Sequence, residues 1–217
     1  MKLRRVAAAL LVLLLGTCTG QALQYDKVAL GHASKILLIA RGRITDGDTQ
    51  RLLGFLLSLP ASDRVAGMVV DSPGGGLVEA ETLAGVIRRA GFPLFVPPGG
   101  QCSSACFLLF AAAPNRFVAA DAAIGVHRAN ENGKETLAAR TATAAMLKDV
   151  LELGVPDPIV AKLARTPPNQ KSWLSPSDFA AMRVSIVAGG QPRAGLADWG
   201  DADRKQIEAW FAILSAR

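Results

Sequence analysis

The sequence predicts an α/β domain, and three observations support this fold class. Half of the 217 residues are apolar and 19% are charged, so the chain can bury a core. Between residues 27 and 187, short apolar runs typical of buried strands alternate with segments of helical period. This alternation implies right-handed crossovers, and the length fits one domain with appendages.

The elements follow from these patterns and from the residues that interrupt them. Strand 65–70 is apolar and stops at Asp71-Ser-Pro-Gly-Gly-Gly76, and helix 77–90 carries its apolar residues on one face before a Gly91 C-cap. Segment 102–113 is apolar and ends at Pro114, so we expect a buried helix there. In order, the patterns predict strands at 35–44, 65–70, 94–96, 116–119 and 123–126, and helices from 48 onward and at 77–90, 102–113, 135–153 and 157–164.

The chain ends are predicted to lie outside this domain. Residues 1–22 have the basic start, short apolar run and small-residue end of an export signal. We expect this signal to be cleaved after Ala22 and the mature protein to lie in the periplasm. Lipidation of Cys18 and an uncleaved membrane anchor are the alternatives, although ten apolar residues are about half of the roughly 20 that cross a bilayer. The α/β domain then covers 23–187, a Gly/Pro-rich linker covers 188–200, and 201–217 form an amphipathic helix.

The charge distribution argues against nucleic acid as a partner. The formal net charge is +6, but Lys2, Arg4 and Arg5 belong to the export signal, and removing them leaves 21 basic and 18 acidic residues. No basic run is interleaved with aromatic residues as in a nucleic-acid track. The glycine-rich turn at 71–76 lacks the lysine of a phosphate loop and the spacing of a dinucleotide fingerprint. We expect no cofactor and no metal.

Three features stand out as candidate chemistry. The turn 71–76 precedes a helix and could present backbone N–H groups to an anion, although it could also be a simple turn. Ser104 follows a flexible Gly99-Gly100 segment and could be a nucleophile or merely cap a helix. His127 ends an apolar strand and could be a base or a structural residue. The other histidine, His32, receives no role.

Read in order, these features resemble the successive motifs of the Clp protease proteolytic subunit, in the Clp/crotonase superfamily. The motifs are Asp71-Ser-Pro-Gly-Gly-Gly76, Gly100-Gln-Cys-Ser-Ser-Ala-Cys-Phe-Leu-Leu109 and Ile124-Gly-Val-His127. The resemblance covers about 35–187, and exported bacterial Clp-like proteins are its nearest form. It implies a Clp/crotonase-like spiral core of repeated ββα units with C-terminal helices.

The resemblance also implies site residues. Ser104, rather than Ser103, matches the nucleophile, and His127 matches the general base. Gly75 and Ala105 match the positions whose N–H groups form the oxyanion hole. It further places Cys102 in the turn before the helix, where a disulfide to Cys106 becomes possible, although two buried thiols are the alternative.

The third catalytic residue departs from the family pattern. In the family a carboxylate lies two residues before an aromatic-Leu-Ser sequence, and Trp173-Leu-Ser175 places Lys171 at that position. Asn169 could orient His127 through its amide oxygen instead. Asp178 and Asp157 are further alternatives, although Asp157 is placed to cap a helix. We favour Asn169.

Three functions are therefore compared. The first is an exported serine hydrolase that cleaves peptide bonds; the second is a non-catalytic binding module, which Lys171 favours; the third is a crotonase acting on coenzyme A thioesters. A peptide or protein is the expected substrate. The Clp subunit forms rings and works with an ATPase, so a homo-oligomer is possible here, but no ATPase partner is expected for an exported protein.

Overall fold

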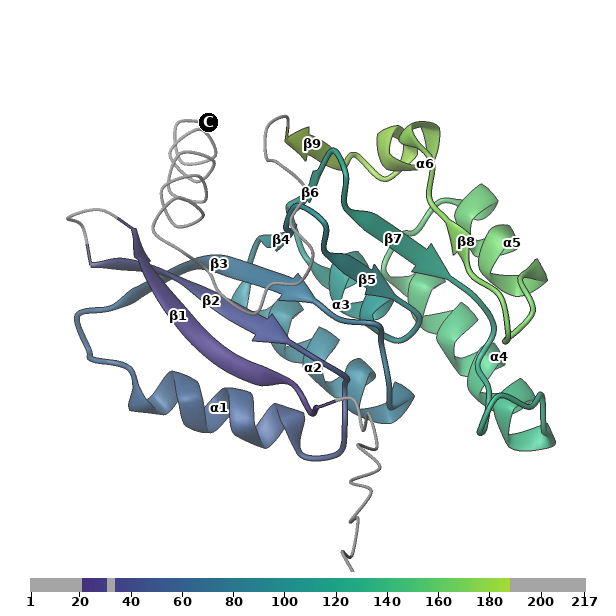
Figure 1. Ribbon diagram of the computed structural model, residues 1–217, viewed down its shortest axis with the longest axis horizontal. Coiled ribbons are helices and arrows are strands. Elements are labelled where there is room, and N and C mark those ends of the chain that lie inside the picture. Colours follow the sequence, from purple (N-terminus) through teal and green to yellow (C-terminus); the bar gives the residue numbers. More distant parts are fainter. Residues whose placement is uncertain (1–20, 31–33, 188–217) are drawn as a thin grey trace, which may run out of the picture.

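The computed structural model of the protein describes residues 21–30 and 34–187 (Figure 1). The predicted linker at 188–200, the predicted helix at 201–217, His32 and all but the last two residues of the predicted export signal lie outside this part. The elements, in chain order, are β1 (Gln24–Leu30), β2 (Lys35–Arg41), α1 (Asp48–Ser58), β3 (Arg64–Asp71), α2 (Leu77–Ala90), β4 (Leu94–Val96), β5 (Gln101–Ser103), α3 (Cys106–Ala112), β6 (Arg116–Ala119), β7 (Ala123–Val126), α4 (Leu137–Glu152), α5 (Asp157–Arg165), β8 (Ser172–Trp173), α6 (Pro176–Ala181) and β9 (Ser185–Val187).

The strands form two sheets. The larger has the order β1-β2-β3-β4-β6-β9 and is parallel except for β1, which pairs antiparallel with β2. The smaller sheet has the order β5-β7-β8, with β5 parallel and β8 antiparallel to β7. A bridge between Ser72, just after β3, and Cys102 in β5 joins the two sheets. The end of β3 is thereby held beside the small sheet.

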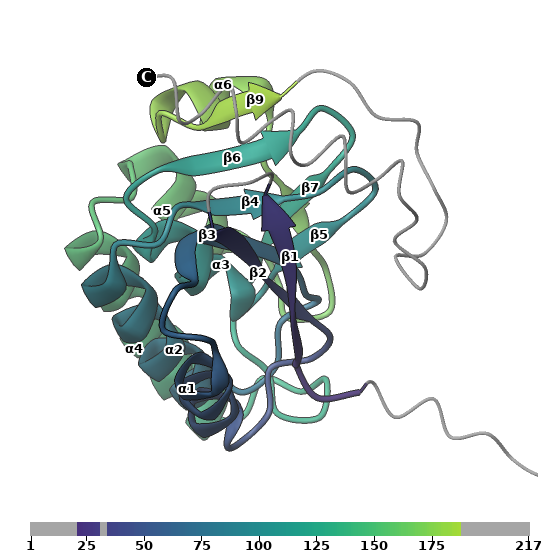
Figure 2. The same cartoon turned by 90° about the vertical axis from the view of Figure 1, so that its left-hand side faces the viewer.

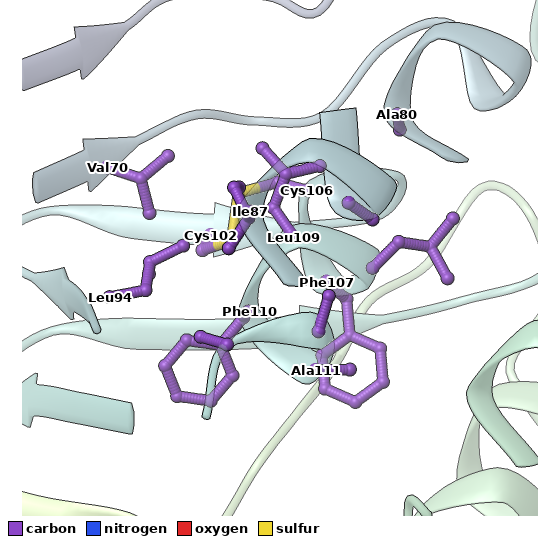
Figure 3. Packing of buried hydrophobic residues seen from close by; sticks show 14 of the residues in the cluster. Val70, Ala80, Ile87, Leu94, Cys102, Cys106, Phe107, Leu109, Phe110 and Ala111 are labelled. Carbon is purple, nitrogen blue, oxygen red and sulfur yellow. A yellow bond between two sulfur atoms is a disulfide. The ribbon is translucent and has the colours of Figure 1, made fainter. Parts of the chain in front are cut away.

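The core lies between the large sheet and its helices. Figure 2 shows α1, α2 and α4 gathered on one side of the sheet. Helix α3 is buried along its whole length, and Phe107 and Phe110 pack in a cluster with Val70, Leu94 and residues of α2 (Figure 3). A buried Phe contributes about 1.5 to 3 kcal/mol through the apolar surface that it removes from water. The segment before α3 is therefore anchored by the core of the domain.

The α/β prediction and the order of the predicted elements are confirmed, with corrections at some boundaries. The helix predicted from 102 starts at Cys106, because Cys102 and Ser103 pair with Ile124 and Gly125 in the small sheet. Cys102 thus precedes the helix in a strand and not in a turn. Strand β1 was not predicted, because its polar and charged residues suit an edge strand more than a buried one. Three further short strands were not predicted: β5, the two-residue β8 and β9.

Within residues 21–30 and 34–187, no helix combines the length and the hydrophobicity that crossing a membrane requires.

Candidate active site

The glycine-rich turn after β3 is tied to the start of β5 by hydrogen bonds. Oδ1 of Asp71 accepts from the N–H of Gln101 at 2.9 Å, and the N–H of Ser103 donates to the carbonyl of Ser72 at 3.1 Å. The hydroxyl of the buried Ser72 accepts from the N–H of Gly74 at 3.1 Å. These bonds fix the turn against the segment that carries Ser104.

Gly74 and Gly75 allow this close approach because neither has a side chain. A Cβ on Gly74 would lie 2.5 Å from the carbonyl oxygen of Ser103, and one on Gly75 would lie 1.9 Å from that of Ile44. The carbonyl of Gly74 and the N–H of Gly76 bond to Ile44 at 3.0 and 2.9 Å. The N–H of Gly75 has no acceptor among the described residues, so it is available to a ligand.

Ser104 occupies a turn between β5 and α3 with a φ of 59°, which is uncommon for a residue with a side chain. Its N–H donates to the carbonyl of Gly125 at 2.9 Å, and its carbonyl accepts from Phe107 at 2.9 Å. Its side chain is half-buried, and its hydroxyl makes no hydrogen bond with the described part of the chain. Such a turn holds a side chain away from the strand and the helix that it joins.

The neighbours of Ser104 have different environments. Ser103 is fully buried, and its hydroxyl donates to the carbonyl of Pro73 at 3.2 Å, so it stabilises the turn. The N–H of Ala105, like that of Gly75, has no acceptor among the described residues. A Cβ on Gly74 would lie 3.0 Å from the Ala105 nitrogen, which shows how closely the two turns approach.

Cys102 and Cys106 form a disulfide that spans the Ser104 turn. The two Cα atoms are 5.2 Å apart, and both side chains are fully buried beside Ile87 and Leu109 (Figure 3). The bond links the last strand residues before Ser104 to the first residue of α3. It therefore restrains the turn from both ends.

His127 follows the end of β7 and is buried. Its Nδ1 lies 2.7 Å from the carbonyl oxygen of Arg128. A carbonyl can only accept, so Nδ1 carries the proton and Nε2 keeps the lone pair that a general base needs. Burial lowers the pKa of His127 below its ordinary value; the Arg128 bond acts in the opposite direction, and the positive charge of Lys171 lowers the pKa further.

Parallel pairing places the ends of β5 and β7 at one edge of the small sheet. Ser103 is paired with Gly125, one residue before Ser104 and two before His127. The structure therefore brings Ser104 and His127 to neighbouring strand ends, with the Gly75 turn held against Ser104. No hydrogen bond joins the Ser104 hydroxyl to the imidazole of His127 in the structure; such a bond can tighten when a substrate binds.

The candidates for a third residue lie in less defined surroundings. Asn169 is exposed in the segment between α5 and β8 and makes no hydrogen bond with His127 in the described part of the chain; its role as the orienting residue is not tested by the structure and stays a prediction. Asp178 is buried at the start of α6, where it accepts from the Ser175 N–H at 2.7 Å and pairs with Lys162. Hydrogen bonds from Lys162 and Ser175 outweigh the effect of burial and lower its pKa. Asp157 is the first residue of α5.

Two groups near the site were missed by the sequence analysis. The carbonyl of Arg128 orients the imidazole, and no sequence signal identifies a backbone acceptor. Arg43 lies close enough to Lys171 for its charge to lower the pKa of that lysine, although burial is the larger cause. Arg43 directly precedes Ile44, which bonds the glycine turn. That this segment lies beside the turn is a long-range contact, so the sequence alone does not show it.

The described residues have the Clp/crotonase fold, and the neighbours among solved structures come from both branches of it. ClpP1 from Listeria monocytogenes matches with a TM-score of 0.53 and 18% identity, over 73% of this chain and 93% of that one. The 1510-N membrane-bound stomatin-specific protease matches with a TM-score of 0.51 and 17% identity, over 69% and 77%. Enoyl-CoA hydratase from Bacillus anthracis matches with a TM-score of 0.54 and 12% identity, over 88% and 77%. No family model and no curated protein matches the sequence.

Proposed function

We propose that this chain is a serine hydrolase that cleaves peptide bonds, with Ser104 as nucleophile and His127 as general base. The observation that carries the proposal is the position of Ser104. This residue has a positive φ, and its hydroxyl makes no hydrogen bond with the described residues. It follows the end of β5, which pairs with β7, the strand that precedes His127. Two of the structural neighbours are proteases. The Nδ1–H to Arg128 bond leaves the Nε2 lone pair available for the serine proton.

The proposed reaction follows from these groups. Nε2 of His127 takes the Ser104 proton while Oγ attacks the peptide carbonyl carbon, and the carbonyl electrons move onto its oxygen. The N–H groups of Gly75 and Ala105 donate to this oxyanion. As the oxyanion collapses, the C–N bond breaks and His127 gives its proton to the leaving amine. Water, deprotonated by His127, then hydrolyses the acyl ester on Ser104.

Labelling with a fluorophosphonate probe tests this proposal. The folded wild-type chain should react, while Ser104→Ala and His127→Ala should lose labelling and peptide hydrolysis by about 10³-fold or more. Ser103→Ala is the matched control and should keep most of both, because its hydroxyl bonds Pro73. Labelling that persists in Ser104→Ala would remove this serine from the mechanism.

A non-catalytic binding module is the second candidate, and Lys171 at the position of the family carboxylate favours it. A positive charge cannot stabilise the imidazolium that forms when His127 takes a proton. If the folded wild type neither labels nor hydrolyses a broad peptide and ester library, the binding module is the better description. The enoyl-CoA hydratase neighbours keep the crotonase reaction as a third candidate.

We further propose that residues 1–22 direct export to the periplasm and are then removed. The Cys102–Cys106 disulfide supports this, because disulfides persist in oxidising compartments. The intact mass of the exported protein should correspond to a start at Leu23. A mass that includes residues 1–22, or a lipid on Cys18, would contradict it.

A further inference from the structure

A cleft of about 460 Å³ opens between α5 and the segment before β8. Apart from two prolines, its lining consists of Lys162, Arg165, Thr166, Gln170, Lys171 and Ser172. Three of these side chains are cationic and none is acidic. The volume lies within the range of pockets that hold small ligands or part of a peptide.

This cleft adjoins the candidate active site. The N–H of Arg128, the residue after His127, donates to the carbonyl of Thr166 at 3.0 Å. Ser172 pairs with Val126, the residue before His127. The cleft wall is therefore bonded to the chain on both sides of the histidine.

The positive charges of the cleft are only partly neutralised. Lys162 pairs with Asp178, whereas Arg165 and Lys171 have no carboxylate partner among the described residues. The nitrogen of Lys171 lies 5.4 Å from the centre of the Trp173 ring, which supports the ammonium without neutralising it. Arg43 adds a like charge from the side of the glycine turn, and together with burial it lowers the pKa of Lys171.

An arrangement of this kind favours an anionic ligand. Like charges held together repel each other, and an incoming carboxylate relieves this repulsion while gaining charge-assisted hydrogen bonds. Thr166, Gln170 and Ser172 add polar groups to the same wall. A cationic substrate would be repelled by the positive charges of this cleft.

We propose that the cleft binds a carboxylate of the substrate, so that the chain acts on acidic peptides carrying Glu or Asp close to the scissile bond. This inference rests on the proposed function and names the substrate class of the same site. Arg165 and Lys171 are the specificity-determining residues. Lys171, which lines the cleft and also affects His127, links recognition to the catalytic centre.

Equilibrium binding to Ser104→Ala tests the inference without requiring catalysis. The probes are two short fluorescein-labelled peptides with amidated ends, alike except for Glu or Gln at one position. The Glu peptide should bind roughly tenfold more tightly by fluorescence anisotropy, the effect of one charge-assisted contact. Added salt should reduce this preference. Equal binding of the two peptides would overturn the proposal.

Substitutions locate the preference in the cleft. Arg165→Gln should reduce the Glu preference to about threefold or less, and combining it with Lys171→Met should abolish it. Lys148→Met is the matched control, because this lysine is 75% exposed on α4 and does not line the cleft, and it should keep the full preference. A Glu preference that survives the double substitution would place recognition elsewhere.

Competition and labelling separate the other possibilities. If coenzyme A binds tightly, depends on Arg165 and displaces the Glu peptide, the cleft serves a phosphate ligand and the acidic-peptide assignment is wrong. If the wild type labels with fluorophosphonate but shows no charge preference, only the inference fails. If the Glu preference holds and depends on Arg165, but the wild type never labels, the proposed function fails while the cleft remains a carboxylate site.

Discussion

On the serine side of the site, backbone hydrogen bonds and one disulfide hold the Ser104 turn, whereas on the histidine side a single hydrogen bond within the described residues holds a buried ring. Ser104 lies between strand and helix, is held by Gly125 and is bordered by the Cys102–Cys106 bond. The ring of His127 bonds the carbonyl of Arg128, and Lys171, whose charge acts on this ring, is exposed, as is Asn169.

If the chain is the proposed hydrolase, this difference separates two tasks. The position of the nucleophile and the oxyanion donors must be fixed before substrate arrives, because a misplaced donor stabilises the transition state poorly. The histidine side can vary in its charged residues as long as the imidazole keeps its tautomer, which a backbone carbonyl supplies here. Substitutions on the serine side should therefore have larger effects than those beyond His127.

Gly75→Ala should give the largest effect of the predictions that follow. A Cβ would lie 1.9 Å from the Ile44 carbonyl oxygen, so the turn must shift. The Gly75 N–H then no longer points at the proposed oxyanion. We expect kcat to fall by about 10²-fold or more, the cost of an oxyanion donor, together with a lower free energy of unfolding. Steady-state kinetics and urea denaturation measure the two effects.

Gly54→Ala is the control for that substitution. Gly54 lies inside α1 with no atom within 4 Å of an added Cβ, so alanine should leave kcat unchanged and raise stability by up to about 1 kcal/mol. Unchanged kcat in a folded Gly75→Ala protein would remove this turn from the oxyanion hole.

Replacing Cys102 and Cys106 together by alanine should destabilise the serine side. Closing a five-residue loop restricts the unfolded chain by about 2 kcal/mol, and both side chains are fully buried. We expect a loss of this size in urea denaturation and a lower kcat, because the Ser104 turn is no longer restrained. Alkylation of the never-reduced protein followed by mass spectrometry should find the two cysteines linked; two alkylated thiols would contradict the bond.

The sequence predicted the two sides of the site to different depths. Ser104, His127 and the glycine turn were predicted from short motifs with glycine and serine at fixed positions, and the structure places these segments together, while their catalytic roles stay predictions. The start of α3 was misplaced because Cys102 and Ser103 are apolar or small, and strand pairing with Ile124 and Gly125 is a long-range contact that local periodicity does not contain.

The histidine side could not be predicted to the same depth. The sequence analysis looked for a side chain that orients His127, because a sequence identifies side chains and not the positions of backbone carbonyls. In the structure, the group that bonds Nδ1 of His127 is the backbone carbonyl of Arg128. The cleft was also not foreseen, since Arg165 and Lys171 are separated by a Pro-Pro turn and look like scattered surface charges in the sequence.

Lys171→Met should shift the pH dependence of activity. The charge of Lys171 disfavours the protonated ring and lowers the pKa of His127, so removing it should raise this pKa. The base must be neutral, so activity is present above the His127 pKa and is lost as pH falls through it. We therefore expect the acid limb of kcat/KM to move to higher pH in the variant. Lys148→Met should leave the profile unchanged, and a shift to lower pH would contradict the assigned charge effect.

Asn169→Ala should have the smallest effect, within about twofold in kcat/KM, because removing an orienting group matters only where that group holds the ring. Asn169 is exposed, and the Nδ1–H of His127 is already donated to Arg128. Asp178→Ala is the contrasting variant: it removes the capping box of α6 and the partner of Lys162, so it should lower stability by about 1 to 2 kcal/mol and leave the acid limb in place. Nitrogen-15 spectra of the histidines should show the Nδ1–H form of His127 in the wild type and in Asn169→Ala alike. A large loss of activity in Asn169→Ala together with a change of tautomer would instead assign the orientation of His127 to the Asn169 amide.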